Sequence, residues 1–170
     1  MRILAGRYKG LSIQTVAKAP YRPTKSRVRK SIFDKITPFH YQSVLDCFSG
    51  SGILGFESAS RGASHITFVE KHRKTFSLLK KNCQHFQGAH FFPVFKDVFK
   101  YLANTEKSFD LIFADPPYGK VDLLKLTHAI LPLLNENGKF ILECESGEPA
   151  FLGAISSDYG DTRILTWTKT

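Results

Sequence analysis

Two hydrophobic spacings alternate along most of the chain. Short, nearly continuous apolar runs are typical of strands buried on both faces, whereas apolar residues that recur every three or four positions are typical of amphipathic helices. Strands and helices that alternate in this way predict an α/β fold, with a mostly parallel central sheet and helices on both faces. We expect its strands at residues 44–46, 65–69, 90–95, 109–114 and 139–145.

The helical spacing predicts helices at residues 53–61 and 74–86, a short helix after residue 97, and a helix over residues 121–134. Pro132 should break the last of these, because proline removes a backbone donor and its ring clashes with the preceding turn. Asn137-Gly138 is expected to turn the chain into the fifth strand. Residues 164–167 form a further expected strand, but the stretch before Tyr159 is short and leaves its partner unidentified.

The N-terminal part of the chain follows a different pattern. Residues 2–15 alternate weakly and contain two glycines, which predicts a small hairpin of short strands. After a proline-containing loop, Thr24 is a suitable N-cap for a helix that runs to about Ile36. We therefore expect an extension over residues 1–38, made of this hairpin and helix, and one compact domain over residues 39–170.

The overall composition narrows the class of protein. A chain of 170 residues, 42% of them hydrophobic, can bury one core. No apolar run approaches the roughly 20 residues that span a bilayer, and no signal-peptide core follows the start, so we expect a cytoplasmic protein that does not bind membranes. Three cysteines without a CxxC pair, and histidines without metal-ligand spacing, favour reduced thiols and no bound metal. We also expect a monomer.

The positive charge of the chain is concentrated at one end. Nine of the 24 Lys and Arg residues lie in residues 1–30, the first acid is Asp34, and the other 15 basic residues balance all 15 acids. A segregated basic block is the expected footprint of a phosphate backbone, although single arginines are often only solvated. An anionic membrane is less suitable, because no amphipathic helix with an apolar face accompanies the charge. The candidate phosphate contacts are Arg2, Arg7, Lys9, Arg22, Thr24, Arg27 and Arg29.

A glycine-rich loop follows the first strand. The strand ends on Asp46, and Gly50, Gly52 and Gly55 lead into the next helix. This spacing also matches the dinucleotide fingerprint. A carboxylate at the strand end would repel a pyrophosphate, however, and would suit the ammonium and sulfonium of S-adenosylmethionine. A dehydrogenase is not favoured either, because the chain shows no hydride-transfer site. The remaining alternative for the glycine loop is an ordinary strand-to-helix turn that binds no ligand.

Two further strands end on acids. Glu70 closes the second strand, where a carboxylate can accept hydrogen bonds from both hydroxyls of a ribose; the alternative is an acid in solvent. The fourth strand leads into Asp115-Pro116-Pro117-Tyr118. This motif resembles the one with which the amino-methyltransferases hold the exocyclic amine of a nucleobase. Such an amine is a poor nucleophile, because its lone pair is delocalised into the ring. The Asp115 carboxylate and the Pro116 carbonyl can accept its two hydrogens, and Tyr118 offers a stacking face.

These motifs resemble those of the amino-methyltransferases and, more closely, the RsmD family. The family's opening is present as Met1-Arg2-Ile3-Leu4-Ala5-Gly6-Arg7-Tyr8-Lys9-Gly10, and its basic motif as Arg22-Pro23-Thr24-Lys25-Ser26-Arg27-Val28-Arg29. The resemblance runs from residue 1 to about residue 145. It implies a Rossmann-like class I fold that binds S-adenosylmethionine and methylates a guanine N2 in small-subunit (16S) ribosomal RNA, in an assembled or assembling subunit.

The resemblance also assigns residues to the site. It places Phe48, Lys71, Asp97 and Val98 with the cofactor, Asp97 at the adenine amine and Val98 against the ring. Asp97 is equally suited to cap the helix that follows it. Two other functions stay open: an adenine N6 DNA methyltransferase, which uses the same proline motif but usually carries a further recognition domain, and a non-catalytic RNA-binding factor of ribosome assembly.

Overall fold

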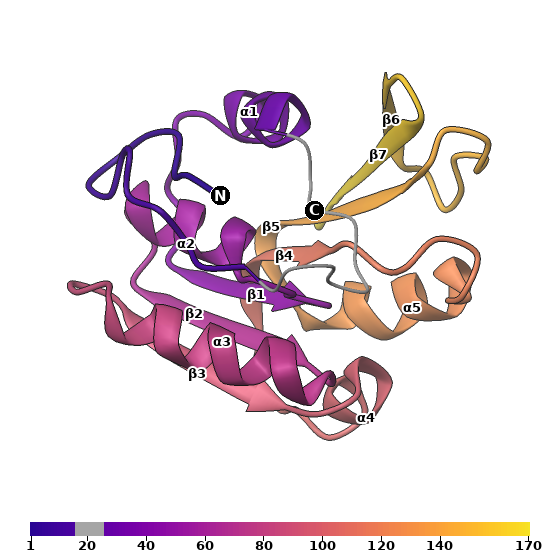
Figure 1. Ribbon diagram of the computed structural model, residues 1–170. Helices are drawn as coiled ribbons and strands as arrows, with labels where there is room; N and C mark the ends of the chain where they lie inside the picture. Colours follow the sequence, from indigo (N-terminus) through magenta and orange to yellow (C-terminus); the bar gives the residue numbers. More distant parts are fainter. Residues whose placement is uncertain (16–25) are drawn as a thin grey trace.

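The structure, a computed structural model, describes residues 1–15 and 26–170. Seven strands form one sheet in the order β3-β2-β1-β4-β5-β7-β6 (Figure 1). Strands β1 to β5 run parallel to one another, and β7 is antiparallel to both β5 and β6. The strands are β1 Ser43–Cys47, β2 His65–Glu70, β3 His90–Phe95, β4 Phe109–Ala114, β5 Leu134–Glu145, β6 Ile155–Tyr159 and β7 Thr162–Thr168.

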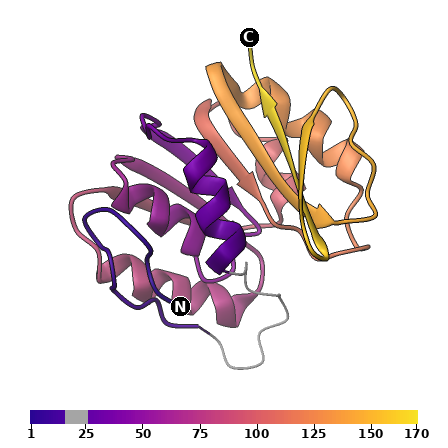
Figure 2. The ribbon, with the colours of Figure 1, turned by 90° about the horizontal axis from the view of Figure 1, so that it is seen from above.

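The helices lie on both faces of the sheet, as the hydrophobic spacing predicted (Figure 2). Successive residues of a strand point to opposite faces, so the strands contribute to two cores. In β1, Val44 packs with α1, α2 and α3, and Leu45 packs with α4 and α5. The helices are α1 Ser26–Lys35, α2 Ile53–Ser60, α3 Arg73–Gln84, α4 Val98–Leu102 and α5 Leu123–Ile130, followed by a 3-10 turn, η1 Leu131–Leu133.

The hairpin predicted for residues 2–15 is present, but its strands do not extend beyond an isolated antiparallel bridge between Arg2 and Ser12. Backbone hydrogen bonds join its two arms: the Ile3 N–H donates to the Leu11 carbonyl at 3.0 Å, and the Ile13 N–H donates to the Met1 carbonyl at 2.7 Å. Some of its backbone donors bond to α2 instead: the N–H groups of Leu4 and Ala5 donate to the Glu57 carboxylate. Its buried side chains join the core beneath α1, α2 and α3, so the segment is packed as part of the same core as the sheet; they are Ile3, Tyr8 and Ile13.

Two predictions near the fifth strand are tested by the structure. Asn137-Gly138 is not a turn that precedes the strand: β5 begins at Leu134, and Asn137 has a positive φ of 60° within it. The register with β4 shifts between Phe109 and Leu111, which marks a bulge at this point. The helix before it ends at residue 130, and Pro132 lies in the 3-10 turn, as a helix-breaking proline should.

The last strand has a clear partner. β6 and β7 form an antiparallel hairpin in which Ile155 pairs with Thr166 and Tyr159 with Thr162. The expected strand over residues 164–167 is confirmed and extended, and the hairpin that the short sequence left in doubt is present. In the described part of the chain, no helix is both long and apolar enough to cross a membrane. Those residues also include no group of three or more His, Cys, Asp or Glu side chains placed to hold a metal.

Candidate active site

The site lies at the carboxyl edge of the four central parallel strands. Register pairs join Cys47 to Val69, Cys47 to Ala114 and Ala114 to Leu142 across these strands. The residue that follows each of these therefore occupies the next level at the edge of the sheet: Glu70 of β2, Phe48 after β1, Asp115 after β4 and Glu143 of β5. The fold brings these four residues, which are far apart in sequence, into one row.

A cavity of about 300 Å³ opens over this row. The volume falls in the range of small-molecule sites. Apolar side chains and charged groups share its wall, so it can hold a ligand with both an aromatic and a polar part. It is lined by Phe48, Val69, Glu70, Lys71, His72, Val98, Asp115, Pro116, Pro117, Tyr118, Lys120 and Glu143.

The glycine loop enters the helix α2 tightly. Gly52 has a φ of 84°, a conformation that disfavours residues with a Cβ. A Cβ on Gly55 would lie 2.2 Å from the Phe68 ring, so this glycine allows α2 to approach the sheet closely. The loop is fixed by Glu70, whose carboxylate accepts hydrogen bonds from the Gly50 N–H at 3.0 Å and the His72 N–H at 2.7 Å. Glu70 therefore lines the cavity and holds its loop.

Asp46 lies beneath the loop and is not on the cavity wall. The residue is 2% exposed, and its carboxyl group accepts a hydrogen bond from the Gly55 N–H at 3.0 Å. Burial raises the pKa of Asp46 to about 8; the Gly55 hydrogen bond opposes this shift and the Glu70 charge adds to it. The geometry supports a role in fixing the loop, and a contact of Asp46 with a cofactor stays a prediction.

Asp97 also lies off the wall. Its side chain caps α4 by accepting hydrogen bonds from the backbone N–H groups of Phe99 and Lys100. The Lys71 ammonium lies 3.5 Å from the Asp97 carboxylate, which joins the ends of β2 and β3. A helix cap was the alternative to cofactor binding for Asp97, and the structure shows this cap. Val98, the next residue, is buried and lines the cavity, and its contact with an adenine ring stays a prediction.

The proline motif lines the side of the cavity next to β5. Asp115 is half-buried at the end of β4, and Pro116 is buried. The Tyr118 hydroxyl lies 3.4 Å from Oε1 of Glu143 and 3.3 Å from Oγ1 of Thr162. These contacts hold the outer edge of the tyrosine ring against β5 and β7. The expected amine-binding residues thus share one cavity with the expected cofactor residues Phe48 and Glu70.

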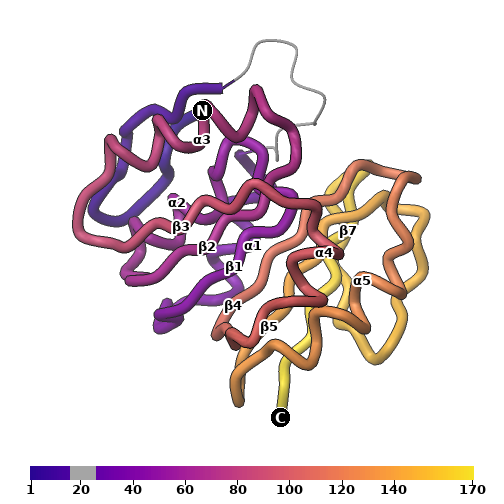
Figure 3. The backbone as a smooth tube through the Cα atoms, turned by 90° about the horizontal axis from the view of Figure 1, so that it is seen from below, coloured from indigo at the N-terminus to yellow at the C-terminus, as the bar shows by residue number. Residues whose placement is uncertain are grey.

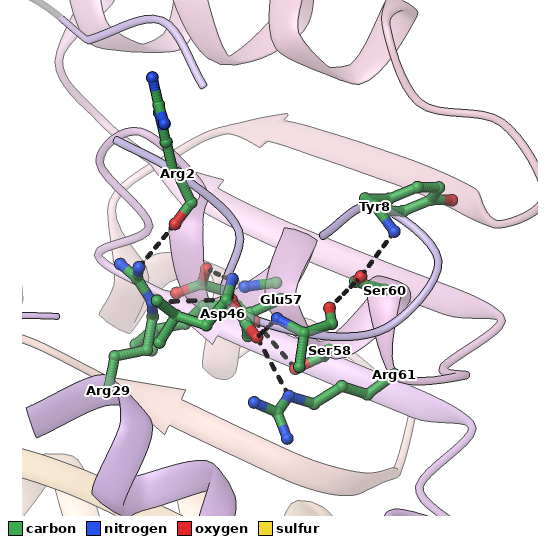
Figure 4. A network of polar contacts seen from close by, with 12 residues as sticks. Arg2, Tyr8, Arg29, Asp46, Glu57, Ser58, Ser60 and Arg61 are labelled. Carbon is green, nitrogen blue, oxygen red and sulfur yellow. Dashed lines mark hydrogen bonds and ion pairs between the residues drawn. The ribbon is translucent and has the colours of Figure 1, made fainter. Parts of the chain in front are cut away.

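The N-terminal segment is fixed to the same unit by a buried carboxylate, Glu57 (Figure 4). Glu57 is 0% exposed and accepts the N–H groups of Leu4 and Ala5 at 2.8 and 3.1 Å. The Arg61 Nε atom donates to it at 3.1 Å, and the Arg29 Nε atom lies 3.7 Å away. One buried acid of α2 therefore gathers the N-terminal backbone and two arginines.

A second link joins this segment to the glycine loop. The Asn82 side chain of α3 accepts the Gln14 N–H at 3.1 Å and donates to the Gln14 carbonyl at 3.0 Å. The same amide nitrogen lies 3.3 Å from the Ser51 carbonyl. The N-terminal segment runs beside α3 in this region (Figure 3). One buried amide therefore connects residue 14 with the loop at the cavity.

The candidate phosphate contacts divide into three groups. Arg2, Lys9 and Arg27 are exposed; Arg7 is exposed too, and donates to the Gly88 carbonyl at 2.8 Å. The structure contradicts the phosphate contact expected of Arg29, which is 2% exposed and donates to the Arg2 carbonyl at 2.7 Å. Burial lowers the pKa of this arginine. The remaining two candidates lie outside the described residues; they are Arg22 and Thr24.

Four wall residues were not predicted as site residues from the sequence: Val69, His72, Lys120 and Glu143. Glu143 could have been detected from the sequence, because it follows an apolar run within its strand. The neighbouring parallel strands also end on an acid or a loop at the same position along the sheet edge. Glu143 was missed because β5 continues through Cys144 and Glu145, so that no strand end marks it.

Comparisons with known proteins agree with this geometry. A family model described as "Conserved hypothetical protein 95" matches residues 1–164. A protein of Haemophilus influenzae named ribosomal RNA small subunit methyltransferase D is 35% identical over 143 residues, which are 81% of this chain and 72% of that protein. A protein of Buchnera aphidicola with the same name is 36% identical over 136 residues, 77% of this chain and 67% of that protein.

A solved structure of a hypothetical protein from Thermus thermophilus is also similar. Its TM-score is 0.86 at 30% identity, and the match covers 98% of both chains. This match extends through the β6–β7 hairpin, so the likeness includes the region beyond residue 145 that the sequence motifs did not reach. The family match, the relatives and the structure cover the described site as a whole, and the chain therefore belongs to the RsmD family of Rossmann-like methyltransferases.

Proposed function

We propose that this protein transfers a methyl group from S-adenosylmethionine to the N2 amine of a guanine in small-subunit ribosomal RNA. One observation carries the proposal: Asp115-Pro116-Pro117-Tyr118 lines the same cavity as Phe48 and Glu70. Residues suited to bind a nucleoside cofactor and residues suited to bind an exocyclic amine thus line one cavity, where the two ligands could meet. Relatives named for methylation of small-subunit ribosomal RNA support the choice of substrate.

The cavity fits the cofactor chemically. The Glu70 carboxylate uses one hydrogen bond on each oxygen for its loop, and a carboxylate has about four acceptor positions, so two remain for ribose hydroxyls. Phe48, Val69 and Val98 supply apolar surface for a purine ring. S-adenosylmethionine brings a methyl group on a sulfonium; every other contribution comes from the side chains and backbone of this protein.

The proline motif positions the nucleophile. The Asp115 carboxylate and the Pro116 carbonyl accept hydrogen bonds from the two hydrogens of the amine and turn its lone pair toward the methyl group. As the new N–C bond forms, the amine must lose a proton, which the Asp115 carboxylate can take. Positioning of this kind can supply most of the rate, without a covalent intermediate. A paired guanine must leave its stack to enter the cavity, and stacking on an aromatic ring such as Tyr118 is worth roughly 1–3 kcal/mol per base.

The RNA contacts are proposed on the N-terminal extension, residues 1–38. Its described exposed cations, Arg2, Arg7, Lys9 and Arg27, can neutralise phosphates. A ribosomal subunit as substrate places the reaction in the cytoplasm. A metal-independent monomer is our expectation, tested by activity in excess chelator and by light scattering.

The decisive experiment is tritiated methyl transfer to unmethylated small subunits, followed by nucleoside analysis. We expect labelled N2-methylguanosine. The Asp115→Ala variant should bind S-adenosylmethionine nearly as well as the wild type and transfer methyl at least about 100-fold more slowly, roughly the loss of one key transition-state contact. Binding of RNA without transfer would identify an assembly factor instead, and label in N6-methyladenine of DNA would identify the other amino-methyltransferase function.

A further inference from the structure

Glu143 is a second carboxylate beside the amine-binding motif. It is 7% exposed, lines the cavity, and stands one position beyond Leu142, the register partner of Ala114. Asp115 follows Ala114, so the two acids occupy the same level on adjacent strands. Neighbouring strands lie about 4.8 Å apart. A base whose amine reaches Asp115 therefore has its adjacent ring edge near Glu143.

The chemistry of this edge distinguishes the purines. In guanine, the ring atom N1 beside the amine-bearing carbon C2 carries a hydrogen; in adenine, N1 beside the amine-bearing carbon C6 carries a lone pair instead. An ionised carboxylate only accepts hydrogen bonds. Within a buried site, a carboxylate opposite an N1 lone pair leaves both groups unsatisfied, which is expensive.

We propose that Glu143 accepts the N1–H of the target guanine and is the residue that selects guanine over adenine. The inference rests on the proposed function, because it needs a purine amine at Asp115. Asp115 and the Pro116 carbonyl then bind the amine hydrogens, and Glu143 binds the neighbouring ring hydrogen. Three acceptors on the ends of two adjacent strands thus match three adjacent donors of one base.

A simpler role for Glu143 is to hold Tyr118, whose hydroxyl lies 3.4 Å from its Oε1 atom. The two roles predict different behaviour with 2-aminopurine, which keeps the N2 amine but has a lone pair at N1. If Glu143 accepts the N1–H, the loss of that hydrogen in 2-aminopurine must slow methyl transfer only when the Glu143 carboxylate is present. If it only holds the tyrosine ring, a Tyr118→Phe variant should reproduce the effect of losing Glu143.

The test uses small-subunit RNA with guanine or 2-aminopurine at the methylated position, once nucleoside analysis has located it. Wild type should methylate guanine at least about 100-fold faster than 2-aminopurine, as expected when a site built for a hydrogen bond meets an analogue that lacks it. Glu143→Gln offers an amide that can donate to N1, so it should lower this preference at least about tenfold, the value of one satisfied hydrogen bond. Glu143→Asp keeps an acceptor and should retain the preference at a lower rate.

Two measurements accompany the rates. S-adenosylmethionine affinity and thermal melting should be similar in Glu143→Gln and wild type, and Tyr118→Phe should leave the preference for guanine unchanged. An unchanged preference in Glu143→Gln, or an equal change in Tyr118→Phe, would overturn the inference. Absence of methyl transfer by the wild type to any RNA would be a failure of the proposed function instead.

Discussion

Replacement of Asp46 by asparagine should change the stability of the protein in a strongly pH-dependent way, favouring the variant over the wild type increasingly as pH rises. The Asp46 carboxyl is buried beneath the glycine loop, and burial raises its pKa to about 8 from an ordinary value of 3.8. Between these two values the unfolded chain has lost this proton while the folded protein still holds it. The group therefore contributes its full stability below about pH 4, and this contribution is lost as pH rises toward 8.

The magnitude follows from the size of the shift. Each pH unit within this window costs about 1.4 kcal/mol of folding free energy, so the wild type should lose about 3 to 4 kcal/mol from Asp46 between pH 5 and pH 8. Asparagine does not titrate. Its amide has a fixed cost in the buried site, but that cost is the same at both pH values and cancels in the comparison. The Asn Oδ1 atom can also keep the hydrogen bond from Gly55.

Urea denaturation of both proteins at several pH values measures this effect. The difference in unfolding free energy, variant minus wild type, should rise by about 3 kcal/mol from pH 5 to pH 8. Parallel stability curves would refute the reasoning, because they would mean that the folded protein does not hold a proton on Asp46. The Glu70→Gln variant is a useful control. It removes the negative charge that helps to raise the pKa of Asp46, so the pH range over which the wild type loses stability should end at a lower pH.

Three further predictions concern the loop, the N-terminal segment and RNA. Glu70→Ala removes acceptors for Gly50 and His72, and calorimetry should show S-adenosylmethionine binding weakened by roughly 1.5–3 kcal/mol; unchanged affinity would contradict its place in the site. Glu57→Ala leaves the buried Arg29 and the half-buried Arg61 without their acid and should cost about 3–5 kcal/mol in urea denaturation, against little for an exposed acid. A Lys9→Ala, Arg27→Ala double variant should flatten the slope of log affinity against log salt by up to about 2 at unchanged cofactor affinity; an identical slope would place the RNA elsewhere.

The sequence predicted those parts of the molecule that have local signals. Glycines at a strand-to-helix turn, and acids that close apolar runs, are read from neighbouring residues, so Glu70 and Asp115 could be placed in one site from the chain's pattern alone. Parallel pairing then puts all such strand ends at one edge of the sheet. The hairpin at the C-terminal end was uncertain because its first strand, β6, is short and largely polar.

The errors arose where partners are distant in sequence. Weak alternation in residues 2–15 predicts two strands, and the two arms do bond to each other, but the N–H groups of Leu4 and Ala5 bond to Glu57, more than fifty residues away, so the pairing stays at one bridge. Arg29 was expected to contact phosphate because it belongs to the basic block, yet it lies against the same buried acid. Charge patterns do not show which cation of a block is buried, because that depends on which helix packs over it.

The amide of Asn82 has a consequence for how substrates are chosen. It bonds to Gln14 at the end of the first described segment and to Ser51 in the loop at the cavity. Under the proposed function, this link fixes the distance between the phosphate-binding cations of the N-terminal segment and the methyl-transferring groups at the cavity. An RNA bound by both would then have to present its backbone and its extruded guanine at that distance simultaneously, which a folded RNA does at no further entropic cost and a flexible strand does not. Selection of the target would then rest on the three-dimensional shape around the guanine more than on its neighbouring bases.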